Sequence, residues 1–171
     1  MSRNEPLFNT VALQQDSTPE ADGAGPRRSA PPLRLTLASR LGDKVDGAWW
    51  PRTGMILREL SELVSVLGNR LGPVDDININ WSSLQGLPDL DWDVWRGIHR
   101  HVMTIRGRDA RANLLIVPYR TGAALAIMVL RQAAGLAIDP EHRNTRAFQS
   151  ADCIVRRARG ESVASTLVKN R

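Results

Sequence analysis

The chain has 171 residues, of which 42% are hydrophobic and 24% are charged, a balance typical of one soluble globular domain. Its most apolar run, residues 123–130, is far shorter than the roughly 20 residues of a membrane-spanning helix, and the N-terminus lacks the apolar core of a secretory signal. The single cysteine, Cys153, cannot form an internal disulfide. These features predict a cytoplasmic protein without a membrane partner.

The net charge of +5 is concentrated in one part of the chain. Residues 141–171 hold seven basic and three acidic side chains, whereas the preceding residues hold 16 basic and 15 acidic ones. A basic segment attached to a nearly neutral body is a feature of proteins that contact phosphate groups. Nucleic acid is therefore one of the partners to be considered.

Residues 1–32 are rich in Ser, Pro, Gly and acidic side chains and carry no sustained apolar pattern. A segment of this composition buries too little surface to offset its loss of conformational entropy. We therefore expect a disordered leader over residues 1–32. A core domain is predicted over residues 33–137, and a basic helical extension over residues 138–171.

Two strands are predicted at the start of the core domain. Residues 33–39 alternate between leucines and polar side chains, the pattern of a strand with one buried face. Residues 45–50 form the second strand, which ends where Pro51 removes a hydrogen-bond donor. In an extended segment Trp49 and Trp50 point to opposite faces. We expect only one of the two rings to enter the core, so that the other is available for stacking on a ligand.

A helix and a third strand follow. Apolar residues at helical spacing predict a helix over residues 56–71, with Thr53 as its N-cap. Residues 74–81 alternate again and predict a strand. On that strand Asn78 and Asn80 lie on the polar face.

The remaining elements are two strands and two helices. Residues 98–106 and 111–119 are predicted to form antiparallel strands joined by a tight connection. Arg100 lies on the polar face of the first of these. A helix is predicted over residues 121–134, closed by a glycine, and a last, basic helix over residues 145–159.

The order of these elements predicts an α+β domain. We expect an antiparallel sheet of about five strands with the two main helices packed on one face, followed by the basic C-terminal helix. The alternating strands imply that the other face of the sheet is partly polar.

The segment Asp46–Arg52, with the sequence DGAWWPR, carries the most specific pattern in the chain. Together with Leu57, Glu59-Leu60 and the run LLIVP at residues 114–118, it resembles an actinobacterial domain family of unknown function. The resemblance covers roughly residues 33–134. It implies no enzyme activity, cofactor or partner, and supports the domain boundaries alone.

Our first functional hypothesis is a non-enzymatic binding or regulatory module that contacts an unknown protein or small molecule. The polar face of the sheet and the edge of the tryptophan–proline segment would form its contact surface. In the alternative, residues 82–97 or the C-terminal helix cover the second tryptophan and the segment is structural. The candidate binding residues are Asp46, Trp49, Trp50, Arg52, Asn78, Asn80 and Arg100.

The second hypothesis is association with nucleic acid through the basic C-terminal helix. Arginines can bind phosphates without sequence specificity. Acidic residues are interspersed among them, and no recognised nucleic-acid module precedes them. A solvated face or a helix that docks on a partner is therefore the alternative. The candidate phosphate or partner contacts are Arg146, Arg156, Arg157 and Arg159.

The third hypothesis is a small-molecule or metal-dependent enzyme. His99 and His101 are two residues apart on a predicted strand and share a face, but zinc needs three or four ligands. The sequence spacing does not identify His142, Cys153 or the acidic residues within 89–93 as further ligands of such a metal ion. A nucleophile elbow and a glycine-rich phosphate loop are also absent from the sequence. We therefore interpret the two histidines as ordinary edge residues and predict no metal, no cofactor and no catalytic residue.

Overall fold

The structure, a computed structural model, describes residues 32–79 and 101–169, with side chains up to residue 160. Most of the predicted leader lies outside these residues, as do Asn80 and Arg100. The elements in chain order are β1 (Leu35–Leu37), β2 (Gly47–Trp49), α1 (Ile56–Leu71), β3 (Val74–Asn78), β4 (Val102–Gly107), β5 (Arg111–Ile116), α3 (Ala123–Ala133), the short 3₁₀ helix η2 (Pro140–His142) and α4 (Arg146–Lys169).

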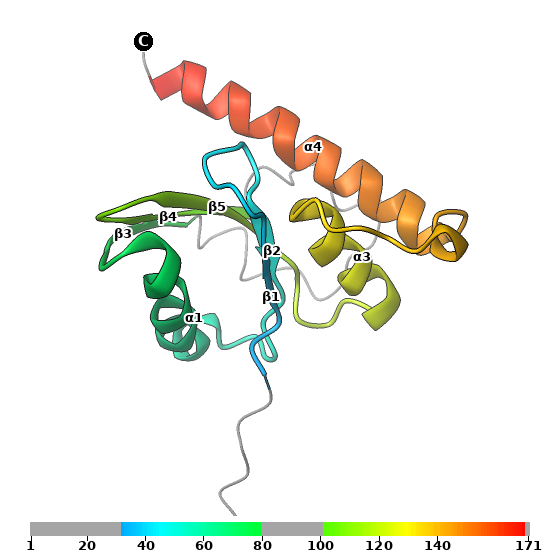
Figure 1. The fold of residues 1–171 in the computed structure, drawn as a ribbon, viewed down its shortest axis with the longest axis horizontal. Helices are drawn as coiled ribbons and strands as arrows, with labels where there is room; N and C mark the ends of the chain where they lie inside the picture. Colours follow the sequence, from blue (N-terminus) through cyan, green and yellow to red (C-terminus); the bar gives the residue numbers. More distant parts are fainter. Residues whose placement is uncertain (1–31, 80–100, 170–171) are drawn as a thin grey trace, which may run out of the picture. The chain divides into compact units, whose positions relative to one another are not determined.

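The strands form one mixed sheet in the order β1-β2-β5-β4-β3 (Figure 1). Three neighbouring pairs are antiparallel, but β2 and β5 run parallel. The predicted α+β class is confirmed, whereas the purely antiparallel sheet is wrong. The parallel pair arises because α1, β3 and β4 intervene between β2 and β5. No local turn fixes the relative direction of strands so far apart in the chain.

The register of the strands places two kinds of side chain on opposite faces of the sheet. Leu35, Trp49 and Ile116 are paired across β1, β2 and β5, so their side chains share one face. Thr36 and Ala48, one residue away along their strands, point to the other face. The alternation predicted for the first strand is therefore confirmed.

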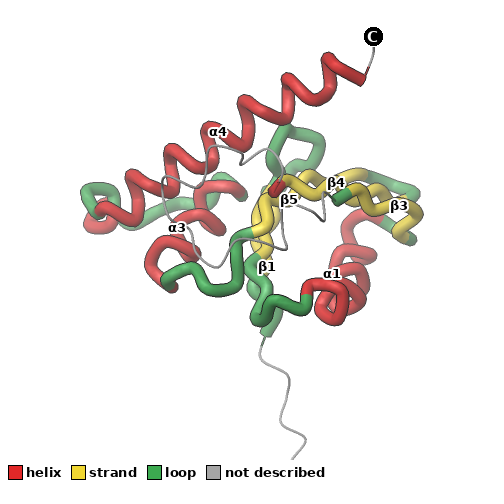
Figure 2. Tube along the Cα trace, turned by 180° about the vertical axis from the view of Figure 1, so that it is seen from behind, coloured by secondary structure: helices red, strands yellow, loops and turns green. Residues whose placement is uncertain are grey.

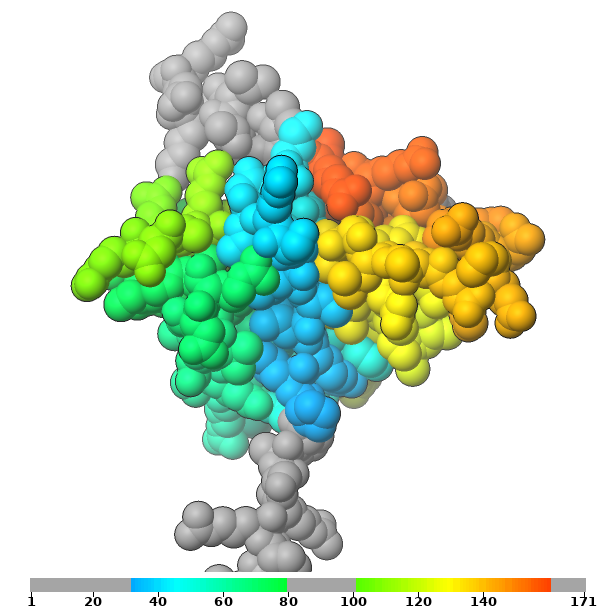
Figure 3. Space-filling view, in the orientation of Figure 1, coloured from blue at the N-terminus to red at the C-terminus, as the bar shows by residue number. Residues whose placement is uncertain are grey.

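Each face of the sheet carries its own hydrophobic core. The α1 core contains Trp49, and the α3–α4 core contains Trp50. Figure 2 shows α1 and α3 on opposite sides of β1, and in Figure 3 β1 (blue) separates the green α1 from the yellow end of α3. The expectation that the two main helices share one face is wrong, because Ala48 on β2 and Leu115 near the end of β5 face away from the α1 core and pack in the α3–α4 core. The α1 core also includes Leu63, Leu67, Leu71, Met103, Ile105, Leu114 and Ile116; the α3–α4 core includes Leu115, Val117, Ala126, Val129 and Ala133.

Helix α4 is longer than the sequence predicted. It continues past residue 159, where the predicted helix ended, through Gly160 to Lys169. Figure 1 shows its first half lying along α3. The C-terminal segment therefore contributes directly to the α3–α4 core, in which its buried residues are Ala151, Ile154, Val155 and Ala158.

The end of α3 is fixed by a glycine in the left-handed conformation. Gly135 has a φ of 66° and donates its N–H to the carbonyl of Gln132 at 3.2 Å. The N–H of Leu136 donates to the carbonyl of Arg131 at 2.9 Å, which completes a Schellman motif. The predicted glycine stop is confirmed. This turn sets the direction of the chain between α3 and α4.

Replacing either tryptophan by alanine is expected to destabilise the domain, because each ring fills a different core. Trp49→Ala and Trp50→Ala should each lower the free energy of unfolding by about 3–5 kcal/mol, measured by urea denaturation. Leu57→Ala, at a position on α1 that is 70% exposed, is the control and should change it by less than about 0.5 kcal/mol. Wild-type stability in Trp50→Ala would show that this ring is not part of the α3–α4 core.

Candidate functional site

Asp46, a predicted binding residue, is fully buried. Its Oδ1 accepts the backbone N–H groups of Gly42 and Asp43, each at 2.8 Å, and its Oδ2 accepts the N–H of Asn113 at 2.8 Å. The carboxylate therefore closes the turn before β2 and ties that turn to β5. Its acceptor sites face the protein's own backbone, so Asp46 acts as a structural residue at this point of the fold.

The two tryptophans point to opposite faces, as predicted, but both are buried. The exposed fraction is 0% for Trp49 and 9% for Trp50. The indole N–H of Trp50 donates to the carbonyl of Tyr119 at 3.3 Å. The expectation that one ring stays outside the core is wrong, because β2 is an interior strand with a core on each face.

The stacking partner of Trp50 comes from the same chain. The guanidinium carbon of Arg34 lies 3.7 Å from the centre of the Trp50 ring, within the range of a cation–π contact. Its Nε donates to the carbonyl of Trp50 at 3.1 Å, and its Nη2 donates to the carbonyl of Pro51. Arg34 therefore stacks on the Trp50 ring, in the position where the sequence predicted that a ligand would stack.

Arg52 and the residue after it are held by a buried carboxylate on α1. Glu59 Oε2 accepts the N–H of Arg52 at 2.8 Å, while Oε1 accepts the N–H of Thr53 at 2.7 Å and its hydroxyl at 2.8 Å. Arg52 also forms ion pairs with Glu59 and Glu62. The N-cap position of α1 is Met55, so the predicted capping role of Thr53 is wrong. Its hydroxyl binds Glu59 instead.

Burial alone would raise the pKa of Glu59, because it disfavours the charged form. The hydrogen bonds from the Arg52 N–H and from Thr53, together with the charge of Arg52, outweigh burial and hold the pKa below its ordinary value. The ionised carboxylate is therefore the form that the fold stabilises. It joins the end of the tryptophan–proline segment to α1.

Polar side chains line β3, β4 and β5 on the face opposite the α1 core. The register pairs Asp76 with Arg106 and Arg106 with Arg111, which gives one row of charged residues across three strands. All three are exposed. Arg111 was not among the predicted site residues. The tight turn between Arg106 and Arg111 was the signal that could have found it, because a hairpin pairs the residues that flank its turn.

The neighbouring row consists of Asn78, Thr104 and Asn113. The hydroxyl of Thr104 donates to Asn113 Oδ1 at 2.8 Å, and Asn113 Nδ2 donates to the carbonyl of Asp43 at 2.7 Å. These two side chains are therefore engaged within the fold. Asn78 is exposed. We call the exposed residues Asp76, Asn78, Arg106 and Arg111 the polar sheet surface.

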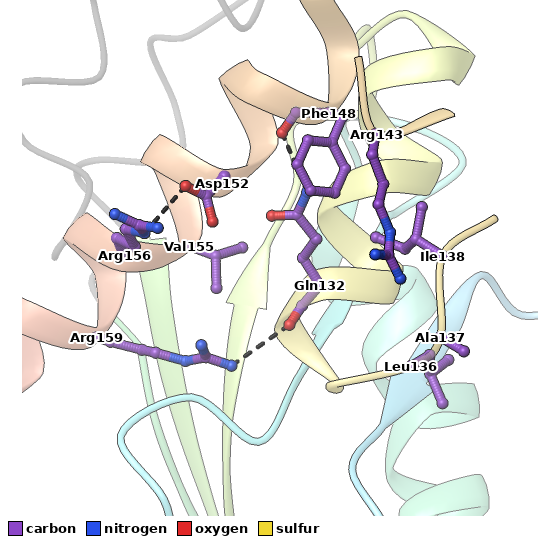
Figure 4. Close-up of a pocket in the computed structure, with 10 residues that line it drawn as sticks. All are labelled: Gln132, Leu136, Ala137, Ile138, Arg143, Phe148, Asp152, Val155, Arg156 and Arg159. Carbon is purple, nitrogen blue, oxygen red and sulfur yellow. Dashed lines mark hydrogen bonds and ion pairs between the residues drawn. The ribbon is translucent and has the colours of Figure 1, made fainter. Parts of the chain in front are cut away.

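A second surface is a pocket between the end of α3 and the first half of α4 (Figure 4). Its volume is about 540 Å³. Arg156 and Arg159, two predicted contact residues, line it, and so does Arg143, which the prediction missed. Arg146 and Arg157 are exposed on α4 but do not line it. The sequence held no signal for this pocket, because it depends on how α3 and α4 pack.

The metal-site hypothesis finds no support in the described part of the chain. There, no group of three or more His, Cys, Asp or Glu side chains could hold a metal ion. His101 is buried, whereas His142 and Cys153 are exposed. His99 and residues 89–93 lie outside the described residues.

In the part of the chain that the structure describes, no helix is long and apolar enough to cross a membrane.

Comparison with known proteins identifies a family for this chain. Residues 33–133 match DUF5994, a family of unknown function. No curated protein and no solved structure matches the chain. The predicted resemblance to a family of unknown function is confirmed, and the roles of the two surfaces have to be inferred from their geometry.

Glu59→Gln is expected to lower the free energy of unfolding at neutral pH by about 1–3 kcal/mol, because an amide loses the charge-assisted bonds from Arg52 and Thr53. The folded-state pKa lies below the unfolded value of about 4.3. The stabilisation by Glu59 is therefore complete above that value and is lost as the pH falls through the folded pKa.

Urea unfolding of both proteins between about pH 7 and pH 3 measures this dependence. The difference in stability between wild type and Glu59→Gln should shrink on acidification. Glu62→Gln, which removes a more exposed ion pair, is the control and should cost less than about 1 kcal/mol. A difference for Glu59→Gln that stays constant over the pH range would contradict the proposed role of its charge.

Proposed function

The chain belongs to DUF5994, a family of unknown function, and we propose that its domain is a non-enzymatic binding or regulatory module. The proposed contact surface is the polar sheet surface, and the proposed partner is a protein with acidic groups. The observation that carries the proposal is the exposed row of Asp76, Arg106 and Arg111 across three strands. A cytoplasmic location belongs to the same proposal and is supported by the single cysteine.

The charges in this row favour an acidic partner. Arg106 and Arg111 are directly opposite each other, and like charges in that position destabilise a sheet. Asp76 offsets the charge of Arg106 from one side only. A carboxylate from a partner would relieve the repulsion, and guanidinium groups bind carboxylates through two parallel hydrogen bonds.

The shape of the surface favours a protein over a small molecule. Its residues lie on adjacent strands of an open sheet, whereas small ligands are usually bound in concave pockets. Asn78 adds a side-chain amide that can donate and accept hydrogen bonds. Arg106 and Arg111 are the expected main contacts, because arginine is enriched among the residues that dominate binding energy at protein interfaces.

Trp49, Trp50, Asp46 and Arg52 have an indirect part in this proposal. Their contacts hold β2 in place, and β2 pairs with β5, the strand that carries Arg111. We propose that the tryptophan–proline segment supports the contact surface and does not touch the partner.

Neutralising the two arginines of the row should weaken partner capture without unfolding the domain. The double variant Arg106→Gln with Arg111→Gln should recover the wild-type partner at least about tenfold less well in a native pull-down read by mass spectrometry, because each arginine–carboxylate pair contributes roughly 1.5–3 kcal/mol. Arg108→Gln, an exposed arginine on the intervening turn, is the matched control and should retain capture. If the double variant captures every partner of the wild type, the proposed contact surface is wrong.

Nucleic-acid association is a second candidate, supported by the exposed arginines of α4. Arg146, Arg156 and Arg157 are all exposed on that helix, although Arg156 pairs with Asp152 at 3.0 Å. Phosphate contacts by these side chains would produce affinity that falls steeply with added salt.

Because α4 supplies buried residues to a core, substitutions test this candidate better than truncation. Arg146→Gln combined with Arg157→Gln should weaken binding of a labelled single-stranded oligonucleotide and reduce the slope of log affinity against log salt concentration by about 1–2. Fluorescence anisotropy measures both, with Arg108→Gln as the control. Absent or salt-insensitive binding by the wild type would exclude this candidate.

A further inference from the structure

The pocket between α3 and α4 has the dimensions of a small-molecule site. Its volume of about 540 Å³ lies within the roughly 300–1,000 Å³ of known ligand pockets. The last turn of α3, the chain that follows Gly135 and the first half of α4 form its walls (Figure 4). None of its lining residues belongs to the polar sheet surface, so a ligand bound here goes beyond the binding role proposed for that surface.

The walls combine an apolar surface with three guanidinium groups. Ile138, Phe148 and Val155 are among the apolar residues that line the pocket. Phe148 and Arg143 both line the pocket, and in Figure 4 Arg159 extends from α4 toward Gln132 on α3. A pocket with an aromatic ring and guanidinium groups in its lining offers a stacking surface and a charge to the same ligand.

The pocket carries positive charge that its own carboxylate does not balance. Asp152 pairs with Arg156, with 3.0 Å between its Oδ2 and the Nε of the arginine. Arg159 donates from Nη2 to the carbonyl of Gln132 at 3.3 Å, which leaves its charge uncompensated. In the described residues no ion pair joins Arg143 or Arg159 to a carboxylate. The lining therefore has a net charge of +2 from three arginines and one aspartate.

The pocket is formed by the fold itself. The Schellman motif at Gly135 directs the following chain into the wall. Arg131 Nη1 donates to the carbonyl of Ala137 at 2.7 Å, and Gln132 Nε2 donates to the carbonyl of Phe148 at 3.1 Å. A wall that is already held in place lowers the cost of ordering on binding.

We propose that this pocket binds a small organic anion: a carboxylate, phosphate or sulfonate head group on an apolar or aromatic body. Arg143 and Arg159 hold the head group through charge-assisted hydrogen bonds. The body packs against Phe148, Ile138 and Val155. The anionic head is required because two guanidinium charges face the pocket, and the apolar body is required because hydrocarbon forms much of the remaining wall.

The α4 arginines that lie outside the pocket provide the matched control. Arg146 is on the same helix, exposed, and absent from the lining. Arg159 also joins α4 to α3 through Gln132, so a loss in its variant alone could reflect loosened packing. Arg143, at the end of η2, is exposed and is the cleaner position to change.

The test uses the full chain and the fluorescent probe anilinonaphthalene sulfonate, which has an anionic head and an aromatic body. Fluorescence titration should give saturable binding at one site. Arg143→Gln and Arg159→Gln should each weaken it roughly tenfold, while Arg146→Gln should leave it unchanged. Urea unfolding of each protein confirms that a variant is folded like the wild type.

Competition separates the two parts of the ligand. Octanoate should displace the probe, whereas octanol, which lacks the charge, and inorganic phosphate, which lacks the body, should do so at least about tenfold less well. The proposal is overturned if the wild type shows no saturable site, or if Arg143→Gln binds like the wild type. It is equally overturned if Arg146→Gln weakens binding as much as Arg143→Gln does, a result that would favour diffuse attraction of anions to α4.

Discussion

The fold depends on one short strand that is buried on both faces. β2 is an interior strand, and its extended backbone sends Trp49 into the α1 core and the next residue, Trp50, into the α3–α4 core. The two cores are otherwise built from different helices. A displacement of this strand would therefore disturb both cores at once, which makes its position the main constraint on the domain.

Polar groups fix β2 at each of its ends. Before the strand, the Asp46 carboxylate binds backbone N–H groups of the preceding turn and of Asn113 on β5. After it, Glu59 binds the backbone of Arg52 and Thr53 and so attaches the exit of the strand to α1. Each carboxylate is buried and satisfied by N–H donors, the condition under which burial of a charge is tolerated. The most specific sequence segment of the chain is thus explained by internal contacts.

The features of the fold that could be predicted from the sequence are those that depend on local patterns of residues. The alternation of leucines and polar residues correctly predicted that Thr36 lies on the face opposite the leucines of β1. The alternation of side chains along an extended backbone correctly predicted that Trp49 and Trp50 point to opposite faces. The parallel pairing of β2 with β5 could not be predicted, because it depends on which distant strands meet. For the same reason the burial of Trp50 was missed: its partners, Arg34 and the Tyr119 carbonyl, come from other segments. The α3–α4 pocket likewise exists only after two helices pack.

The side chains of the tryptophan–proline segment make their contacts within the domain. The surfaces open to a partner or ligand are therefore the polar sheet surface and the α3–α4 pocket. The polar sheet surface lies within residues 33–133, the part that matches DUF5994, so a role there would belong to the family fold. Of the residues that line the α3–α4 pocket, only Gln132 lies within the matched part. Arg143, Phe148 and the rest follow it in the chain. A ligand bound in the pocket would therefore depend on the segment that completes the second core. Packing of α4 against α3 creates the pocket wall and also brings the arginines to it, so the proposed ligand binding would depend on the same helix packing that completes the second core.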